Sequence, residues 1–231
     1  MKIIDCFMFF DEKMMLDIRL NILDKHVSHF IICEATYNHR GKSKRLNFNI
    51  SDYSKFKDKI SYIILDKQPN DLRIIKDTDT ENIRNSKILD NAVIRENYQR
   101  NYVTSQLNNF SEDDLILIND LDEIPNLDNF KHTNKITVFK QKMIYYKLNL
   151  VQPNFSWTGS KICKKKYLKS PQWLRNIKSK KYPIWRLDSF FSNKKYNDIT
   201  FIKDGGWHFT NIKSVEEIDY KMKNFLHHLE Y

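Results

Sequence analysis

The hydrophobic positions in the first half of the chain fall into short apolar runs, separated by longer segments with helical spacing. Residues 2–7, 30–33 and 60–65 are apolar runs of strand length, and they predict strands that are buried on both faces. A fourth run, residues 115–118, ends abruptly in a group of acids. Strands of this kind that alternate with helices predict an α/β protein with a parallel sheet.

A helix is predicted between the first two runs, over residues 12–24, with Asp11 as its N-cap. Its apolar face includes Ile22, and three leucines widen that face. A second helix is predicted over residues 90–109, before the fourth apolar run. Residues 66–88, which precede it, are polar and aperiodic and indicate an irregular loop.

Beyond residue 125 the apolar runs lack clear helical spacing. A last helix is predicted after Ser214, with Glu216 and Glu217 in its first turn, where the helix dipole favours acids. No linker-like segment interrupts the 231 residues, so we expect a single domain made of two halves, residues 1–125 and 126–231. Strands are predicted in the second half at residues 136–139, 143–150, 157–163 and 199–202.

The composition, with 41% hydrophobic and 29% charged residues, is that of a globular protein. The net charge of +10 is compatible with an anionic partner, such as nucleic acid, a membrane surface or a phosphorylated substrate. Basic residues are spread along the whole chain. Their densest cluster, residues 161–169, lacks the interleaved aromatic residues of a single-strand binder. Nucleic acid is therefore not an expected partner, whereas peripheral association with a membrane stays open.

Several features predict a cytoplasmic protein. No apolar segment approaches the roughly 18 residues of a membrane span, and the N-terminus lacks the pattern of a signal peptide. The cysteines, Cys6, Cys33 and Cys163, are odd in number, far apart and embedded in apolar runs. They predict reduced thiols in the core rather than disulfides or a zinc site. The sequence does not indicate an oligomeric state.

The most informative stretch is the acidic end of the fourth run, Asn119-Asp120-Leu121-Asp122-Glu123-Ile124-Pro125. Open α/β sheets bind their ligands at the carboxyl ends of strands. Asp120 and Asp122 offer the carboxylate oxygens that hard divalent cations need, with water and a substrate phosphate in the remaining positions. The alternative interpretation is a solvated acidic turn after a core strand.

Three further positions carry candidate chemistry. Arg100, on the helix before this strand, is suited to a ligand phosphate or ribose; the alternative is an ion pair with Glu96. Glu34 ends the second strand, where doubly wound folds place an acid on a ribose, or it is an exposed carboxylate. Gly205-Gly206-Trp207-His208 offers an indole wall and an imidazole for metal or substrate, or it is structural. Motifs of serine hydrolases, P-loop NTPases and zinc proteases are absent.

Short segments of this kind form a pattern along nearly the whole chain. They are Asp5-Cys6-Phe7, Phe9-Phe10, Asp17-Ile18-Arg19-Leu20-Asn21, Glu34-Ala35-Thr36, Arg95-Glu96-Asn97-Tyr98-Gln99-Arg100-Asn101, Asn119 to Pro125, Trp157-Thr158-Gly159, Ser170-Pro171-Gln172-Trp173-Leu174-Arg175-Asn176, Gly205 to Phe209, and the terminal Phe225, His227, Glu230 and Tyr231. Any one of them is weak, but in this order they resemble glycosyltransferase family 17. That is the family of the β-1,4-mannosyl-glycoprotein N-acetylglucosaminyltransferase and its bacterial and viral relatives.

The resemblance implies a GT-A fold: a Rossmann-like, mostly parallel central sheet flanked by helices. In this fold residues 1–125 would bind a nucleotide sugar, and residues 126–231 would form the acceptor side. The resemblance also implies that Asp120 and Asp122 bind Mn²⁺ or Mg²⁺, with His208 as a third ligand. The implied donor is a UDP-sugar, with UDP-GlcNAc expected. The residues implied to contact the donor are Glu34, Arg95, Arg100, Asn101, Asp120 and Trp207.

An inverting transfer is also implied, in which a carboxylate takes the proton of the acceptor hydroxyl. Glu123 is the preferred base because of its proximity to the two aspartates, and Glu96, Asp188 and Asp204 stay open. The expected acceptor is a glycan, a glycolipid or a glycoprotein. Two alternative functions remain: a degenerate GT-A domain that binds glycans or polyanions without catalysis, and a metal-dependent phosphodiesterase or nuclease.

Overall fold

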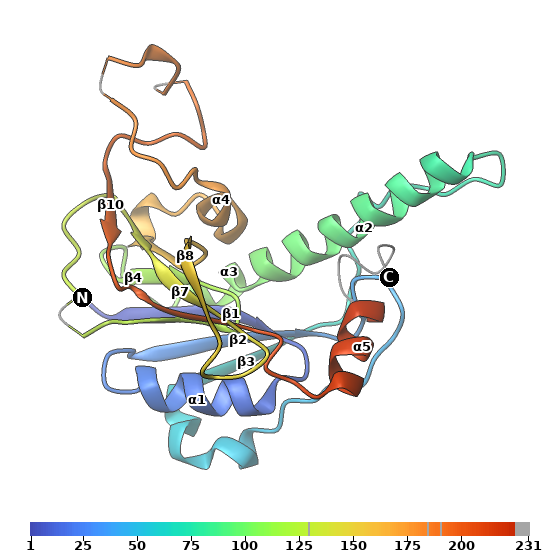
Figure 1. The fold of residues 1–231 in the computed structure, drawn as a ribbon, viewed down its shortest axis with the longest axis horizontal. Coiled ribbons are helices and arrows are strands. Elements are labelled where there is room, and N and C mark those ends of the chain that lie inside the picture. Colours follow the sequence, from blue (N-terminus) through green and yellow to red (C-terminus); the bar gives the residue numbers. More distant parts are fainter. Residues whose placement is uncertain (129, 184, 190, 225–231) are drawn as a thin grey trace.

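Two β-sheets with helices packed against them make up the structure, a computed structural model that describes residues 1–128, 130–183, 185–189 and 191–224 (Figure 1). Its first elements are β1 (Ile3–Phe9), α1 (Lys13–Leu23), β2 (His29–Ala35), η1 (Ile50–Lys59), β3 (Ile60–Leu65), α2 (Glu81–Tyr102), α3 (Thr104–Leu107), β4 (Leu115–Ile118) and β5 (Glu123–Pro125). The later elements are β6 (Ile136–Phe139), β7 (Gln141–Tyr145), β8 (Val151–Trp157), β9 (Lys161–Lys164), η2 (Lys165–Tyr167), α4 (Pro171–Asn176), η3 (Leu187–Ser189), β10 (Ile199–Ile202), β11 (Gly206–Thr210) and α5 (Val215–Asn224).

The larger sheet has seven strands in the order β10-β6-β9-β4-β1-β2-β3. Neighbouring strands are parallel except where β9 runs antiparallel to β4 and to β6. The prediction of an α/β protein with a mostly parallel sheet is therefore confirmed. The smaller sheet has the order β5-β11-β7-β8, so it joins one strand of the first half of the chain to three of the second.

Alternate residues of the central strands pack into different cores on the two faces of the larger sheet. On one face Phe7 of β1 packs in a core with Leu20 of α1. On the other face Cys6 packs in a core with Val103 and with Leu174 of α4. α1 accordingly lies on the opposite side of the sheet from α2 and α4 (Figure 1). This double burial explains why the strands are continuous apolar runs, and all three cysteines are buried without a disulfide, as predicted.

α2 begins at Glu81, so the prediction of an irregular loop over residues 66–88 is wrong for its last part. The first half of α2 projects away from the sheet (Figure 1), and a helix segment that does not pack against a sheet needs no apolar stripe. The loop before it is fastened by Asn91, whose side chain exchanges hydrogen bonds of 2.6 and 3.0 Å with the backbone of Arg73. α2 also ends earlier than the predicted helix, at Tyr102.

The predicted N-cap of α1 is wrong, but most of its predicted apolar face is confirmed, since Met15 and the three leucines are buried. The helix begins after Glu12, whose side chain makes no capping hydrogen bond, and Asp11 forms an ion pair with Lys213 instead. Ile22 is exposed, whereas Arg19 is fully buried among the core positions of the helix. The hydrophobic pattern missed Arg19, because a charged residue is rarely buried.

The second half is only partly as predicted. The strands at residues 136–139 and 199–202 are confirmed as β6 and β10. The predicted run 143–150 ends early at Tyr145, the run 157–163 is divided between β8 and β9, and β5 and β11 were not predicted. α5 follows Ser214 as predicted, and its start is fixed by reciprocal hydrogen bonds between Ser214 and Glu217. The terminal segment 225–231 lies outside the described residues.

Arg19 ties α1 to β1 and to the acidic turn after β4. Its Nε and Nη2 donate to the two carboxylate oxygens of Asp5 at 2.8 and 2.7 Å, and both side chains are fully buried. Asn119 donates to the same carboxylate at 2.7 Å. The remaining nitrogen, Nη1, lies 2.6 Å from the carbonyl oxygen of Glu123 and 3.2 Å from that of Leu121. One guanidinium therefore fixes the backbone of the turn.

We expect Arg19→Met to lower the free energy of unfolding by about 3–5 kcal/mol, because it leaves the Asp5 carboxylate buried without its partner. Urea unfolding of the purified chain measures this loss. Arg84→Met is the matched control, since this arginine is exposed on α2, and exposed substitutions usually stay within about 0.5 kcal/mol. A loss below about 1 kcal/mol for Arg19→Met would contradict the assigned role of the pair.

Candidate functional site

The turn between β4 and β5 carries the acidic stretch, and Asp120 lies there between two arginines. Arg100 of α2 donates to its Oδ1 at 2.9 Å, and Arg175 of α4 donates to its Oδ2 at 2.6 Å. Burial alone would raise the pKa of Asp120, but Arg175 and Arg100 outweigh it and hold the pKa below its usual range. Asp120 is therefore ionised at neutral pH and joins two helices that are distant in sequence.

Arg175 connects Asp120 to Glu123. Its Nη1 donates to Oε2 of Glu123 at 2.6 Å while its Nη2 donates to Asp120. Burial would lower the pKa of Arg175, but the two carboxylates raise it above its usual value. Glu123 also accepts from the indole N–H of Trp157 at 2.6 Å and from the backbone N–H of Asp120 at 3.0 Å. The side chain of Glu123 is fully buried. Its hydrogen bonds hold Arg175 and Trp157 in position.

Both ends of α4 hold Arg175 in place. Ser170 caps the helix by accepting from the backbone N–H of Trp173 at 3.0 Å, with a proline in the first turn. At the other end the buried ammonium of Lys161 donates to the carbonyl oxygens of Arg175 and Ile177 at 2.5 and 2.6 Å. Burial, with Arg175 nearby, lowers the pKa of Lys161 to about 7. The backbone of Arg175 is thus fixed independently of its side chain.

Asp122 faces β11 instead of the arginines. Its Oδ1 lies 3.5 Å from Nε2 of His208. The imidazole stacks on the indole of Trp157 with 4.8 Å between ring centroids, and its Nδ1 lies 2.9 Å from the sulfur of Met143. Burial would lower the pKa of His208, but Asp122 and the other acids of the turn raise it above its usual value. A carboxylate and an imidazole therefore lie side by side at this end of the turn.

Two glycines permit this close packing. A Cβ atom at Gly159 would lie 1.9 Å from Oε1 of Glu123 and 2.3 Å from Nε1 of Trp157. Gly206 has a φ of +115°, and a Cβ atom there would lie 2.1 Å from the carbonyl oxygen of Ile124. Only glycine permits both this close approach and this positive φ without strain.

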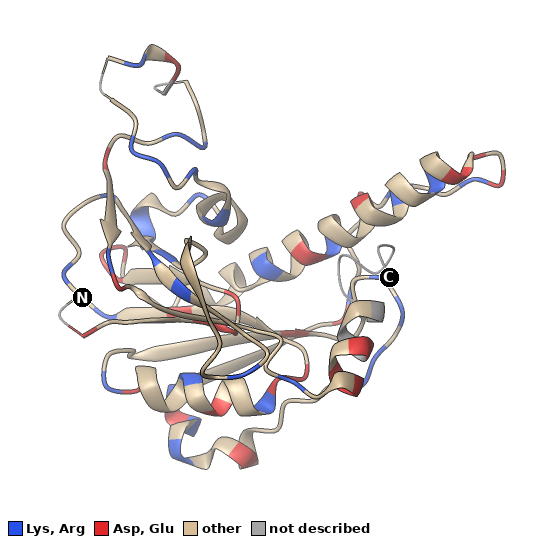
Figure 2. Cartoon of the chain, viewed as in Figure 1, with Lys and Arg blue, Asp and Glu red and all other residues tan. Residues whose placement is uncertain are grey.

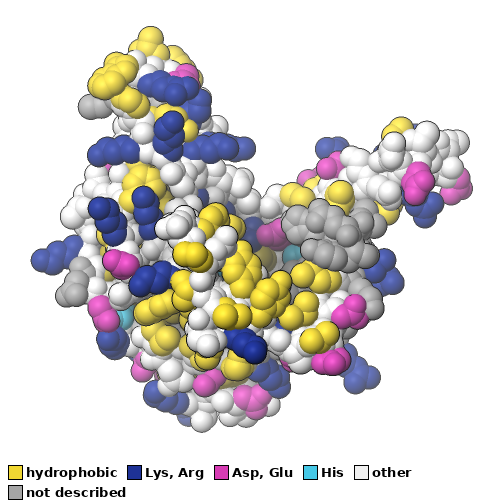
Figure 3. Space-filling model, in the orientation of Figure 1, with side chains coloured by type: hydrophobic (Ala, Val, Ile, Leu, Met, Phe, Trp, Pro, Cys, Tyr) yellow, Lys and Arg dark blue, Asp and Glu magenta, His cyan; other side chains and the backbone are white. Residues whose placement is uncertain are grey.

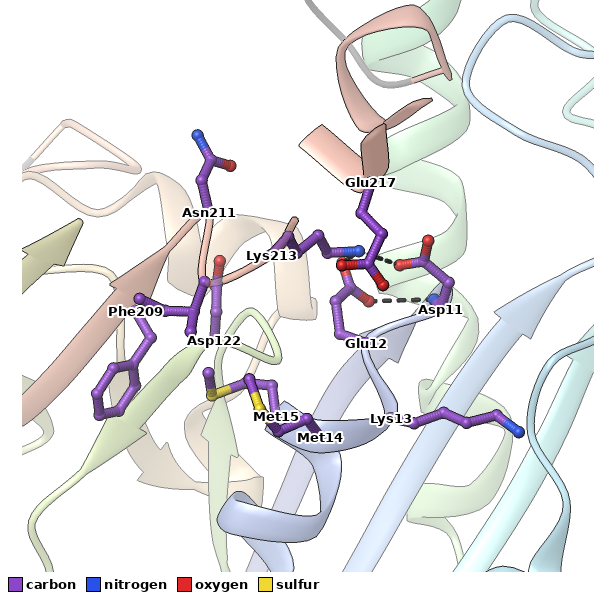
Figure 4. Close-up of a pocket in the computed structure, with 11 residues that line it drawn as sticks. Asp11, Glu12, Lys13, Met14, Met15, Asp122, Phe209, Asn211, Lys213 and Glu217 are labelled. Atoms are coloured by element: carbon purple, nitrogen blue, oxygen red, sulfur yellow. Dashed lines mark hydrogen bonds and ion pairs between the residues drawn. The ribbon is translucent and has the colours of Figure 1, made fainter. Parts of the chain in front are cut away.

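Cavities flank the acidic turn on both sides. One of about 280 Å³ has Asp122 and Phe209 on one side and the Asp11–Lys213 ion pair on the other (Figure 4). A larger one of about 380 Å³ is lined by residues from α2, α4 and the segments around β8 and β9. Its lining includes Glu96, Arg100, Trp157, Lys161 and Arg175.

The three residues predicted to bind a metal do not form a three-ligand site. Among the residues that the structure describes, no group of three or more His, Cys, Asp and Glu side chains could hold a metal ion. Both carboxylate oxygens of Asp120 already accept from arginines. Asp122 and His208 are adjacent, and this donor pair fits a divalent cation that completes its shell with water and phosphate oxygens.

The structure brings further predicted residues to the acidic turn. Glu96 and Arg100 form an ion pair at 2.7 Å and line the larger cavity together. Arg100 also pairs with Asp120, so the ion-pair interpretation of this arginine is confirmed, whereas its contact with a ligand phosphate or ribose stays a prediction. Asn101 lies at the junction of α2 and α4, where its side chain accepts the backbone N–H of Gln172 at 2.9 Å.

Other predicted residues point elsewhere. Arg95 donates to the carbonyl of a residue in the loop after β2. Trp207 lines a separate cavity beside the end of α1, because neighbouring residues of a strand point to opposite faces. Glu34 is buried and accepts four hydrogen bonds, so a nucleoside would have to displace one of them. Asp188 lies in the segment after α4, and the side chain of Asp204 is 82% exposed beside a lysine.

Several residues of the site were not singled out from the sequence. Arg175 and Trp157 occur in segments of the family-like pattern, but no spacing rule predicts that they meet at Glu123. His39 lies close enough that Glu96, Arg100 and Asp120 affect its pKa, which burial lowers. Only a known tertiary arrangement could have identified these three positions.

Comparison with models of known protein families gives a match over nearly the full sequence. The model of glycosyltransferase family 17 matches residues 1–230, which is essentially the whole chain. No curated protein matches the chain. Within the residues described, none of the helices combines the length and the apolarity that crossing a membrane requires.

Arg175→Met tests the electrostatics of the turn. In the wild type the lowered pKa of Asp120 contributes stability that is present above its ordinary value of 3.8 and is lost as the pH falls below it. We expect the variant to be less stable by about 3–5 kcal/mol at pH 7, and this difference to shrink as the pH falls below 3.8. Urea unfolding across this pH range measures the difference, with Arg45→Met as an exposed control. A difference that does not change with pH would contradict the arrangement.

Proposed function

Because this chain belongs to glycosyltransferase family 17 and is thus an N-acetylglucosaminyltransferase-like glycosyltransferase, we propose that it is a metal-dependent inverting enzyme. The family implies a sugar donor and a glycan acceptor. We propose a UDP-sugar as donor, with UDP-GlcNAc as the first choice, and a glycan, glycolipid or glycoprotein as acceptor. The proposal includes a GT-A fold, which the parallel order β4-β1-β2-β3 and the acidic turn at the end of β4 support.

The observation that carries the proposal is the pairing of Asp122 with His208 beside a cavity of about 280 Å³. These two residues would hold Mn²⁺ or Mg²⁺ together with the donor diphosphate. When bound, such a metal supplies a Lewis acid that stabilises the negative charge of a leaving diphosphate. Asp120 has a different part in this proposal: it anchors Arg100 and Arg175.

The larger cavity, on the other side of the turn, supports a place for the sugars. Its lining includes the indole of Trp157, which offers a flat apolar surface for a sugar ring. Arg100 and Arg175 add positive charge to the lining of this cavity next to the acidic turn, where a diphosphate would join a sugar. Their geometry is fixed before a donor binds, which favours electrostatic stabilisation of a developing charge.

The geometry favours Glu96 over Glu123 as the base. A general base must reach the acceptor hydroxyl within hydrogen-bond distance. The carboxylate of Glu123 is fully buried and accepts from three donors. Glu96 is partly exposed, lines the larger cavity and has Arg100 as its ion-pair partner. In our proposal Glu96 therefore takes the proton, and Glu123 positions Arg175 and Trp157.

We expect Asp122→Asn to weaken the binding of UDP-GlcNAc in the presence of Mn²⁺ by at least about tenfold, because it removes a charged metal ligand. Calorimetric titration with and without EDTA measures this, and EDTA should have a similar effect on the wild type. Asp204→Asn is the matched control, because this aspartate is exposed and asparagine tolerates its left-handed φ of 49°.

Donor binding that EDTA does not affect would overturn the metal roles of Asp122 and His208. Screening UDP-, GDP- and CMP-sugars with Mn²⁺ tests the donor class in the same assay. Nuclease activity without binding of any nucleotide sugar would favour the phosphodiesterase alternative, and binding without turnover would favour a degenerate domain.

We expect Glu96→Gln to lower kcat by about 10²–10⁴ with little change in the KM of the donor, because the amide cannot take a proton. Initial-rate kinetics of sugar transfer measure both constants. Glu81→Gln, at the exposed start of the same helix, is the control. Transfer at the wild-type rate by Glu96→Gln, together with a folded but inactive Glu123→Gln variant, would assign the base to Glu123.

A further inference from the structure

A long segment leaves the body of the protein between α4 and β10. We call residues 178–198 the basic protrusion; the structure describes all of it except residues 184 and 190. Figure 1 shows it extending away from both sheets, on the side of the molecule opposite to α1. Among its described residues, the only regular element is the short η3.

The outer part of the basic protrusion exposes large apolar side chains. Trp185 is 83% exposed, Leu187 is 73% exposed and Phe191 is 91% exposed. Figure 3 shows hydrophobic side chains gathered at its far end. A group of exposed apolar side chains of this size indicates an interaction site, because none of the residues that the structure describes covers them.

Positive charge surrounds this apolar end. The basic protrusion has six basic residues and two acidic ones. One of the acids, Asp188, is already paired with Arg186 at 2.7 Å and with Lys195 at 2.5 Å. Figure 2 shows Lys and Arg along both limbs of the segment. The basic residues are Lys178, Lys180, Lys181, Arg186, Lys194 and Lys195.

The base of the basic protrusion is fastened to the body, so its outer end is held in position. The backbone N–H of Lys178 donates to the carbonyl of Lys194 at 2.8 Å and joins the two limbs. Trp173 of α4 donates its indole N–H to the carbonyl of Asn193 at 2.8 Å and packs edge-on against Tyr196. The exposed apolar side chains are therefore carried on a segment whose base is fixed to the body of the protein.

We propose that the basic protrusion docks on an anionic lipid bilayer. Tryptophan and phenylalanine side chains are favourable at the interface between acyl chains and headgroups, while lysines and arginines next to them attract anionic lipids. The exposed apolar side chains match the acyl chains of such a bilayer, and the basic residues next to them match its anionic headgroups. A nucleic acid would match the charge but would leave the exposed apolar side chains without a partner.

Docking would also bring the site close to the bilayer. The larger cavity is lined by Arg175 of α4 and, at the base of the basic protrusion, by Ile177, Lys178 and Ser179. An acceptor carried on a lipid could thus reach the cavity from the surface on which the protein is docked. The docking proposal goes beyond sugar transfer and does not rest on it.

Co-sedimentation of the full chain with vesicles tests the proposal by binding rather than by activity. We expect binding to vesicles of equimolar phosphatidylcholine and phosphatidylglycerol, none to phosphatidylcholine alone, and weaker binding as salt increases. W185S/F191S should weaken binding at least about tenfold. K180E/K181E should weaken it at least about thirtyfold, because each lysine near an anionic surface contributes several-fold.

Matched controls carry the same chemical changes at other exposed positions. I74S removes an apolar side chain that is 76% exposed before α2, and K55E/K57E reverses two exposed charges on η1. Because all the substituted side chains are exposed, each variant should keep the wild-type unfolding midpoint. Absence of binding to the mixed vesicles, or equal losses in the controls, would overturn the proposal. So would binding to a soluble polyanion such as heparin without binding to vesicles.

Discussion

One buried guanidinium fixes the acidic turn on which the site is built. Arg19 neutralises Asp5 inside the larger sheet and donates to the backbone carbonyls of the turn through its remaining nitrogen. Removing two charges from water is costly, so such a pair persists only when all its hydrogen bonds are made. Here they are made to β1 and to the turn after β4. The carbonyl oxygens of the turn face Arg19, whereas the carboxylates of Asp120 and Asp122 stay partly exposed.

The second constraint is charge balance on the outer side of the turn. Arg100 and Arg175 come from helices separated by several strands, and both meet Asp120. Without them the acids of the turn would repel one another in a partly buried place. With them, the two ends of the turn have different environments. Two arginines surround Asp120, and an imidazole lies beside Asp122. Charged side chains that are fixed in this way before a substrate binds are suited to stabilising charge that develops during a reaction.

The sequence predicted those features that depend on local pattern. The strands of the larger sheet are apolar at nearly every position because both faces are covered, so β1 to β4 were recognisable. Asp120 and Asp122 were identifiable because acids follow such a strand directly. By contrast, α2 was predicted to begin too late because its first turns do not pack against the sheet, and Arg19 was hidden among leucines in the core face of α1. The meeting of Arg175 and Trp157 at Glu123 depends on tertiary packing that no spacing encodes.

The proposal of Glu96 as the base instead of Glu123 rests on their environments and not on distance along the sequence. Glu123 lies next to Asp122 and therefore looked like the natural base. In the fold its carboxylate is fully buried and accepts from an indole, a guanidinium and a backbone N–H. Glu96 is distant in sequence, yet it lines the larger cavity beside Arg100. In the proposed mechanism these two carboxylates therefore have different roles, because the environment of a carboxylate, and not only its residue type, determines the chemistry it is suited to.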